Sequence, residues 1–353
     1  MKQLLLLFCF FVSLTAAHAQ DADGARALIR EGVKLHDAGS FAEAIAKYDA
    51  ALEKDKDNFL ALAEKCNTLF SLQRYEESVK LSEYTIALHA TNDQIGMVYL
   101  ACGNSLDHLK RPEEALAMYR QGQKAEPTEH QMWYNEGVTL AGLARYDEAI
   151  ISFQKAVTLK PKHASSHNAL ARMENLKGNR IPALMAFARF LVLEPEGPRA
   201  EANLPLMQKA LRGNVEQTGK GNITISVDGS KMPEPGDSTK HPNDFSTAEL
   251  MMSLMSAADY EKKNKNKPEH ELFQEKFALF CGMLEPTDPP QPGFYWTYYA
   301  PFFRAMKTDE QLATAVMIMH ASSGDKDVEK WIKAHDKEVK TFYVWAGNFE
   351  WPR

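Results

Sequence analysis

The stretch WYNEGVTLAGLARYDEAIISFQKAVTLKP, Trp133 to Pro161, decides the fold of this chain. Prolines stand at Pro127, Pro161 and Pro195, a constant interval of thirty-four residues, and small and aromatic residues recur with the same step. Proline cannot continue a helical hydrogen-bond ladder, so each one ends a helix and directs the chain into the next unit. The pattern therefore predicts a repeated pair of antiparallel helices, packed closely at the small residues and filled by the aromatic ones.

The repeated unit resembles the tetratricopeptide repeat (TPR). The resemblance rests on Trp133, Gly137, Leu140, Tyr146, Ala149, Phe153, Ala156 and Pro161, and the same pattern recurs from Leu28 to Ala51 and from Tyr99 to Pro127. It implies helical hairpins that stack into a right-handed α-solenoid with a concave groove, because no hairpin can bury its faces alone. We expect an all-α fold with about five repeats and a capping helix.

The N-terminus has the order of a secretory signal peptide: Lys2, an apolar run from Leu4 to Leu14, then small residues at Ala17 to Ala19. We expect residues 1–19 to be removed by cleavage before Gln20, leaving an exported protein that is periplasmic or secreted. The apolar run is too short to span a bilayer, which needs about twenty residues. The mature chain is therefore expected to have no transmembrane segment.

Composition predicts three further parts: a TPR array over 22–212, a linker over 213–243 and a helical C-terminal domain over 244–353. The linker is rich in Gly and Pro, and the alternation of Ile223, Ile225 and Val227 indicates a short β-hairpin. Helices of the C-terminal domain are expected to begin at Ser246, after Pro268, near Thr308 and near Val328. This domain loosely resembles helical tails that follow TPR arrays in envelope proteins of Gram-negative bacteria, and that likeness implies no chemistry.

Charge and motifs exclude several classes of function. The formal net charge is −6, so the basic excess of a nucleic-acid-binding protein is missing. The sequence has no HExxH, no GxSxG, no phosphate-binding glycine loop and no paired CxxC. We therefore expect no catalytic residues, no metal site and no cofactor.

The resemblance to TPR proteins places a row of side chains on the concave side, where the first helix of each repeat lies. The row comprises Asn67, Phe70, Asn104, Tyr134, Asn168 and Arg172. Asparagine donates and accepts hydrogen bonds at once, so such a row can hold the backbone of an extended peptide. Chaperone-binding TPRs clamp a terminal carboxylate, but here Met97 and Ala101 stand where that clamp has basic groups.

The favoured function is a non-enzymatic scaffold or adaptor in the cell envelope that binds a protein or peptide in the TPR groove. Tyr295 and Trp296, in the aromatic run GFYWTYYAPFF, belong either to a helical core or to a second docking surface. Two alternatives stay open: an enzyme or ligand-binding module with its site beside Trp296 and His320, and a structural protein that self-assembles as a homo-oligomer. The sequence also leaves open whether Cys66 and Cys102 form a disulfide.

Overall fold

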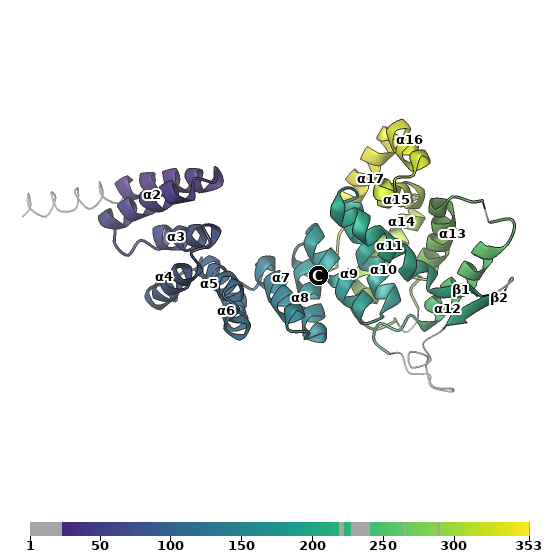
Figure 1. Ribbon diagram of the computed structural model, residues 1–353, viewed down its shortest axis with the longest axis horizontal. Helices are drawn as coiled ribbons and strands as arrows, with labels where there is room; N and C mark the ends of the chain where they lie inside the picture. The colour runs from purple at the N-terminus through teal and green to yellow at the C-terminus, as the bar shows by residue number, and fades with distance from the viewer. Residues whose placement is uncertain (1–22, 219–221, 227–240, 265, 288–289, 353) are drawn as a thin grey trace, which may run out of the picture. The chain divides into compact units, whose positions relative to one another are not determined.

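A computed structural model describes residues 23–218, 222–226, 241–264, 266–287 and 290–352 (Figure 1). The expected signal peptide, its cleavage before Gln20, and Val227 of the expected hairpin lie outside these residues. The chain divides into two compact units, Met1–Arg145 and Tyr146–Arg353, called unit 1 and unit 2 below.

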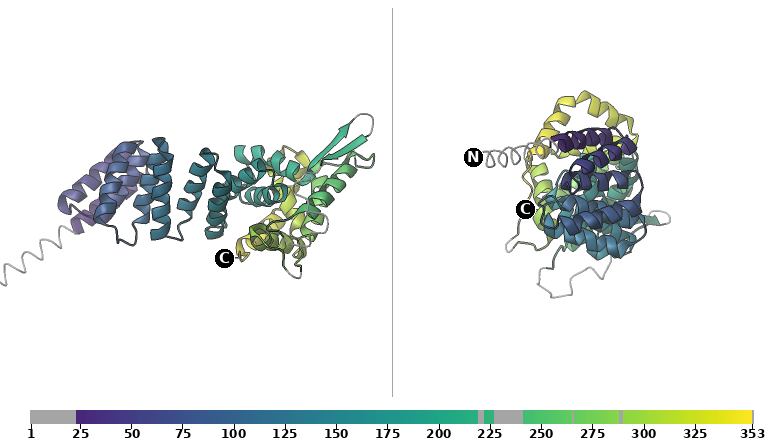
Figure 2. Two further views of the ribbon diagram at one scale, coloured as in Figure 1. Left: turned by 90° about the horizontal axis from the view of Figure 1, so that it is seen from below. Right: turned by 90° about the vertical axis from the view of Figure 1, so that its left-hand side faces the viewer.

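Unit 1 is built from helices that pack in consecutive pairs (Figure 2). They are a helix over residues 23–37, α2 (Phe41–Lys54), α3 (Phe59–Ser71), α4 (Tyr75–Leu88), α5 (Gly96–His108), α6 (Pro112–Ala125) and α7 (His130–Gly142). Beyond these sequential contacts, α5 also touches α3 and α7. The first helices of successive pairs therefore form one continuous layer, as the repeat predicts.

Local sequence explains where these helices begin and how they turn. Asn58 caps α3 by accepting a hydrogen bond from the Ala61 amide at 3.0 Å, and α6 begins with Pro112, which needs no partner for its nitrogen. The turn inside a pair requires a left-handed residue, which is Gly39 in the first pair but Gln73 and Lys110 in the next two.

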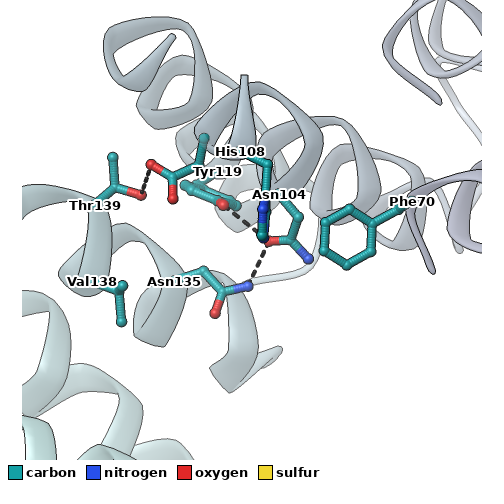
Figure 3. A pocket seen from close by; sticks show the side chains of 8 residues that line it. Phe70, Asn104, His108, Tyr119, Asn135, Val138 and Thr139 are labelled. Atoms are coloured by element: carbon teal, nitrogen blue, oxygen red, sulfur yellow. Dashed lines mark hydrogen bonds between the residues drawn. The ribbon is translucent and has the colours of Figure 1, made fainter. Parts of the chain in front are cut away.

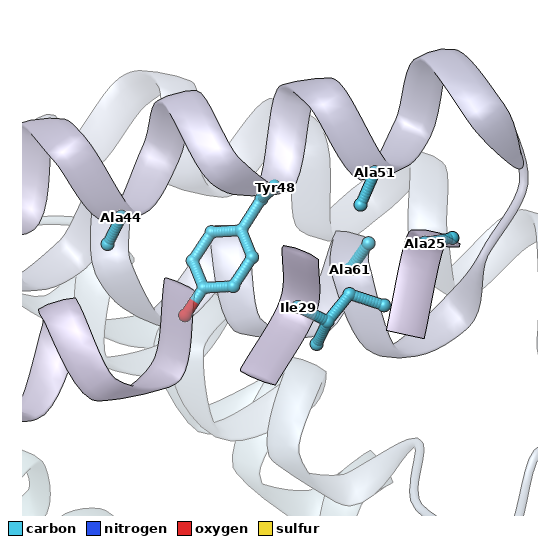
Figure 4. Packing of buried hydrophobic residues seen from close by; sticks show 6 residues of the cluster. All are labelled: Ala25, Ile29, Ala44, Tyr48, Ala51 and Ala61. Atoms are coloured by element: carbon cyan, nitrogen blue, oxygen red, sulfur yellow. The ribbon is translucent and has the colours of Figure 1, made fainter. Parts of the chain in front are cut away.

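The small and aromatic positions of the repeat meet as expected. A Cβ atom on Gly32 would lie 2.4 Å from Cε1 of Tyr48, and one on Gly103 would lie 2.4 Å from Cε1 of Tyr119. Figure 4 shows the Tyr48 ring within the core between the first hairpin and α3, formed by Ala25, Ile29, Ala44, Tyr48, Ala51 and Ala61. Only glycine allows either tyrosine ring to lie flat against the facing helix.

Unit 2 continues the hairpins and adds the C-terminal helices. Its elements are α8 (Tyr146–Leu159), α9 (Ala164–Leu176), α10 (Arg180–Leu193), α11 (Pro198–Arg212), β1 (Asn214–Thr218), β2 (Asn222–Ser226), α12 (Ser246–Ala257), η2 (Ala258–Tyr260), α13 (Glu269–Gly282), η3 (Tyr295–Tyr299), α14 (Ala300–Thr308), α15 (Leu312–Met319), η4 (Ala321–Ser323), α16 (Lys326–Ala334) and α17 (Asp336–Asn348). Over its described residues the architecture is all-α apart from one small hairpin, which confirms the predicted fold class.

The last repeats are not separate from the C-terminal helices, although the sequence places a boundary at residue 212. Every residue of α10 from Ile181 to Val192 is buried, and α10 contacts α12, η3 and α15 as well as its repeat neighbours. A helix that is apolar on all sides must be covered on all sides. The expected capping helix, α11, is likewise covered by α12 and α13.

The aromatic run expected between helices is itself helical, as η3 and α14, and most of its rings are buried. Its tyrosine hydroxyls bond to the repeats: Tyr298 donates to the Val157 carbonyl oxygen at 2.6 Å, and the Tyr299 hydroxyl lies 2.6 Å from Nδ1 of His167. Tyr295 donates to Glu174. A buried hydroxyl needs a partner, so this run is the core that joins the C-terminal helices to α8 and α9.

The guanidinium of Arg189 reinforces this junction. The side chain is 1% exposed and its carbon Cζ lies 4.9 Å from the ring centroids of both Phe302 and Trp351. Its Nη2 donates to the Pro161 carbonyl oxygen at 3.3 Å. A desolvated cation held by two aromatic faces ties α10 to α14 and to the C-terminal segment.

The expected hairpin is present as β1 and β2, which pair antiparallel with Val215 opposite Ile225 and Gln217 opposite Ile223. Both strands pack on α12. Val215 is buried, whereas Ile223 is 38% exposed. The hairpin therefore rests on the C-terminal helices through part of one face only.

Two helix predictions need correction. The helix expected to begin near Thr308 begins at Leu312 as α15, and Thr308 is instead the last residue of α14. The helix expected from Val328 onwards is two helices, α16 and α17, which meet at His335. In this second case the apolar spacing runs on across the break, so it does not reveal the turn. Cys66, Cys102 and Cys281 are free and buried.

Candidate functional site

A pocket of about 300 Å³ lies in unit 1, where the first helices of consecutive repeats form one layer (Figure 3). Its walls come from α3, α5, α6 and α7 and consist of Phe70, Asn104, Asp107, His108, Tyr119, Asn135, Val138 and Thr139. The pocket is thus assembled across repeats.

Two asparagine side chains form the polar wall. Oδ1 of Asn104 accepts hydrogen bonds from the Tyr119 hydroxyl at 2.9 Å and from Nδ2 of Asn135 at 2.7 Å. Burial raises the pKa of Tyr119, so its hydroxyl keeps the proton that it donates. Within the described chain, Nδ2 of Asn104 and Oδ1 of Asn135 have no hydrogen bond. One donor and one acceptor are therefore held in place and unused.

A second hydrogen bond joins α5 to α7 beside the two asparagines. The Thr139 hydroxyl donates to Oδ1 of Asp107 at 3.1 Å. Among the described residues that line the pocket, Asp107 is the only carboxylate, and there is no lysine or arginine. The pocket therefore has no permanently charged cation to balance an incoming anion.

Aromatic and aliphatic groups form the remaining wall. The His108 ring stacks on Tyr75 with centroids 4.7 Å apart and meets Phe70 edge-on at 5.4 Å. Val138 is 43% exposed, whereas most valines in folded proteins are buried. This wall offers an apolar surface beside the two open amide groups.

Of the six groove residues expected from the resemblance, Phe70 and Asn104 line this pocket. Asn67 is exposed on α3 and Tyr134 is half-buried on α7, and neither belongs to the lining. Asn168 and Arg172 lie on α9, in unit 2, and form no part of the pocket.

The positions where a carboxylate clamp would have basic groups pack against the core here. Met97 is half-buried against a hydrophobic cluster, and Ala101 is buried at 3% exposed. A basic side chain in place of Ala101 would therefore begin in an apolar environment.

The sequence reasoning missed Asp107, His108, Tyr119, Asn135, Val138 and Thr139. The repeat itself contains a signal for some of them. Val138 follows Asn104 by one repeat length, and Asn135 precedes Val138 by about one helical turn. Asp107 and His108 follow Asn104 by about one helical turn. Extending one correct groove position by whole repeats and by single turns therefore leads to most of the pocket.

The contacts of Tyr295 and Trp296 favour the helical core over the second docking surface, the two alternatives that the sequence leaves open. Tyr295 is 1% exposed and its hydroxyl is engaged with Glu174. Trp296 is half-buried, stacks on Phe245 with centroids 4.5 Å apart and donates from Nε1 to the Asp244 carbonyl oxygen at 3.0 Å. Large aromatic residues complete a small helical core here, so Tyr295 is not available to a partner.

Neither a metal cluster nor a membrane-spanning helix is found in the described residues. They contain no group of three or more His, Cys, Asp and Glu side chains that is able to hold a metal ion. None of their helices combines the length and the apolar character needed to cross a bilayer.

Comparison with known proteins places the repeat in a family. Residues 100–164 match the tetratricopeptide repeat family. A curated relative, the Hsp70-Hsp90 organizing protein of Triticum aestivum, is 29% identical over 110 residues, which cover 31% of this chain and 19% of that protein. The chain thus spans about a fifth of this relative's length.

Solved structures with similar hairpins include MamA of Desulfovibrio magneticus RS-1, which is 22% identical, with a TM-score of 0.43, over 49% of this chain and 96% of that one. TTC0263 of Thermus thermophilus is 19% identical, with a TM-score of 0.43, over 53% and 98% of the two chains. YrrB, described as a TPR protein with an unusual peptide-binding site, is 23% identical, with a TM-score of 0.40, over 52% and 92%. At these identities and TM-scores, the binding properties of those proteins say nothing about this chain.

The helical pairs of unit 1, the glycine and tyrosine packing inside them and the match over residues 100–164 agree with one another. Residues 100–164 of the chain carry the tetratricopeptide repeat.

Proposed function

We propose that this protein is a non-enzymatic scaffold that binds an extended segment of a protein partner in the pocket of unit 1. The observation that carries the proposal is the pair of open amide groups, Nδ2 of Asn104 and Oδ1 of Asn135. One donor and one acceptor match the carbonyl oxygen and the N–H that every extended peptide backbone presents.

Preorganisation favours such binding. The Asn104 amide is fixed by two hydrogen bonds to its oxygen, from Tyr119 and Asn135, so its Nδ2 donor points in one direction before any partner arrives. Groups that are already ordered lose less conformational entropy on binding. The exposed Val138 and the ring of Phe70 are positioned to cover an apolar side chain of the same segment.

The charge of the pocket favours an internal segment over a free C-terminus. A terminal carboxylate needs cationic partners, whereas the described lining has the Asp107 carboxylate and no lysine or arginine. The curated relative is named for organising Hsp70 and Hsp90. Our proposal for this chain does not include the clamping of a chaperone's terminal carboxylate.

We further propose that the protein acts in the cell envelope, after export and cleavage before Gln20. The order of charged, apolar and small residues at the N-terminus supports this location. Assembly into a homo-oligomer is the competing role, and gel filtration with light scattering separates the two. A stable oligomer whose Val138 is protected from solvent would favour self-assembly over partner binding.

The test compares two asparagines on first helices. A partner recovered by crosslinking from the envelope fraction is titrated against the wild type, Asn135→Ala and Asn67→Ala. Loss of a neutral hydrogen bond costs about 0.5–1.5 kcal/mol, so Asn135→Ala should weaken binding roughly two- to tenfold. Asn67 is exposed outside the pocket, so Asn67→Ala should bind like the wild type. Equal affinities for all three forms would refute the pocket as the site.

A further inference from the structure

A second cavity, also of about 300 Å³, lies within unit 2, between α11 and the C-terminal helices. The residues that give it chemical character are Glu201, Glu269, His270, His320, Ser322 and Asp325. The volume is at the lower end of the range for small-molecule sites. None of these residues lines the pocket of unit 1.

His320 lines this cavity and has an unused acceptor. Its side chain is 1% exposed, and its Nδ1 lies 2.8 Å from the Val316 carbonyl oxygen. A carbonyl oxygen only accepts, so Nδ1 must carry the proton, and a neutral ring then has a lone pair on Nε2. Burial lowers the pKa of His320 to about 4, which keeps the ring neutral at physiological pH.

Nε2 of His320 is buried and has no hydrogen-bond partner among the described residues. The hydroxyl oxygen of Ser322, which lines the same cavity, is buried and unpartnered as well. Leaving a buried polar atom unsatisfied costs free energy. Two such atoms beside one cavity therefore indicate a missing hydrogen-bonding group.

The charges around the cavity specify the kind of group. Glu201, Glu269 and Asp325 contribute carboxylates, and the described residues that line the cavity include no lysine or arginine. Hydrogen bonds from the Asp327 and Val328 amides, together with nearby His270, lower the pKa of Asp325, so it is ionised at neutral pH. Nδ1 of His270 lies 3.0 Å from this carboxylate. The cavity is thus rich in acceptors and negative.

We infer that this cavity binds a cationic nitrogen group, an alkylammonium or a guanidinium. The group donates one hydrogen bond to Nε2 of His320 and is balanced by Glu269 and Glu201 at the rim, both of which are exposed to solvent. Its source is either a free amine or the side chain of a lysine or arginine in a partner.

The experiment uses the full chain labelled with ¹⁵N at its histidine rings. Butylammonium and butylguanidinium are titrated while the Nε2 resonance of His320 is followed by NMR, with butanol as the neutral probe of equal length. We expect a saturable shift with the cations and none with butanol. Pentane-1,5-diamine and an acetylated, amidated Gly-Lys-Gly peptide then distinguish a free amine from a lysine side chain by which binds more tightly.

Two matched substitutions on α13 test the assignment without disturbing the core. Glu269→Gln should weaken cation binding about threefold or more, because a charge-assisted contact is lost. Glu271→Gln makes the same change on an exposed residue outside the cavity, so it should have no effect. His320→Phe should abolish cation binding, followed at the His270 ring, with circular dichroism reporting whether that variant folds.

Three results would overturn the inference. One is the lack of a saturable response to either cation; another is equal weakening by Glu269→Gln and Glu271→Gln. The third is an Nε2 resonance that already shows a hydrogen bond before any probe is added and that no probe changes, which would mean that water alone satisfies the ring.

Discussion

Gly103→Ala tests the packing of the repeat and its connection to the pocket together. The new Cβ would lie 2.4 Å from Cε1, 2.7 Å from Cδ1 and 2.9 Å from Cζ of Tyr119. The ring cannot simply move away, because Tyr119 is 1% exposed and its hydroxyl is bonded to Asn104 at 2.9 Å. Either the α5–α6 pair must separate or that hydrogen bond must break.

The expected free-energy change combines opposing terms. Overpacking costs about 1–3 kcal/mol, and loss of the hydrogen bond costs about 0.5–1.5 kcal/mol. Alanine gains back about 0.5–1 kcal/mol over glycine inside a helix. Taking the middle of each range, the net destabilisation is about 2 kcal/mol, which corresponds to roughly thirtyfold faster amide exchange where exchange requires the pair to open.

Hydrogen exchange of α5 and α6, read by mass spectrometry on the full chain, is the assay. Gly142→Ala is the control, because nothing lies within 4 Å of its Cβ position, and it should leave exchange unchanged or slow it. Gly32→Ala should destabilise the first pair in the same way, since its Cβ would meet Tyr48 at 2.4 Å, yet leave partner binding intact. Exchange in Gly103→Ala as slow as in the wild type would refute the packing argument.

Three further predictions concern pH, boundaries and thiols. Burial lowers the pKa of His167 to about 3 and that of His320 to about 4, so below about pH 6.5 the unfolded chain binds protons that the folded chain does not. Stability should therefore fall as pH drops from about 6.5 towards 4, by about 1.4 kcal/mol per pH unit for each histidine, and urea midpoints that do not change over this range would contradict it. A fragment ending at Arg145 should fold, whereas one ending at Gly213 should aggregate because it exposes α10; a cooperative, monomeric melt of the longer fragment would disprove the shared core. Burial raises the pKa of the three described cysteine thiols, so they should resist alkylation in the folded protein and react on unfolding; a fourth reactive thiol, Cys9, would show that the N-terminal segment is retained.

The repeat architecture was predictable because it depends on local contacts with a fixed period. Gly103 and Tyr119 are sixteen residues apart in the sequence, and their packing follows from one hairpin alone. The fold class is confirmed for this reason. Export and cleavage before Gln20 stay predictions.

The junction in unit 2 was not predictable from the repeat pattern. The period assigns α10 to the repeats, but it does not say what covers the second apolar side of the helix. That information lies in the buried run from Ile181 to Val192 and in Arg189, whose two aromatic partners come from a distant part of the sequence.

About a third of the expected groove residues line the pocket. Phe70 and Asn104 were predicted because the repeat fixes which helix faces the groove. Asn135 was missed in favour of its neighbour Tyr134, because one step along a helix turns a side chain by about 100° and the repeat alone does not fix that rotation. Tyr119 stands at an aromatic position of the repeat, and its ring lies in the core while its hydroxyl bonds to Asn104 at the pocket.

Peptide selection on the wild-type protein, followed by titration against two matched variants, tests the central claim most directly. Val138 and Leu60 are 43% and 41% exposed in unit 1, and only Val138 lines the pocket. An extended peptide bound beside Val138 should lose at least about tenfold in affinity on Val138→Asp, because a second carboxylate would be desolvated near Asp107. Leu60→Asp should leave affinity unchanged. If both variants bind as the wild type does, or if Leu60→Asp alone weakens binding, the pocket of unit 1 is not the partner site.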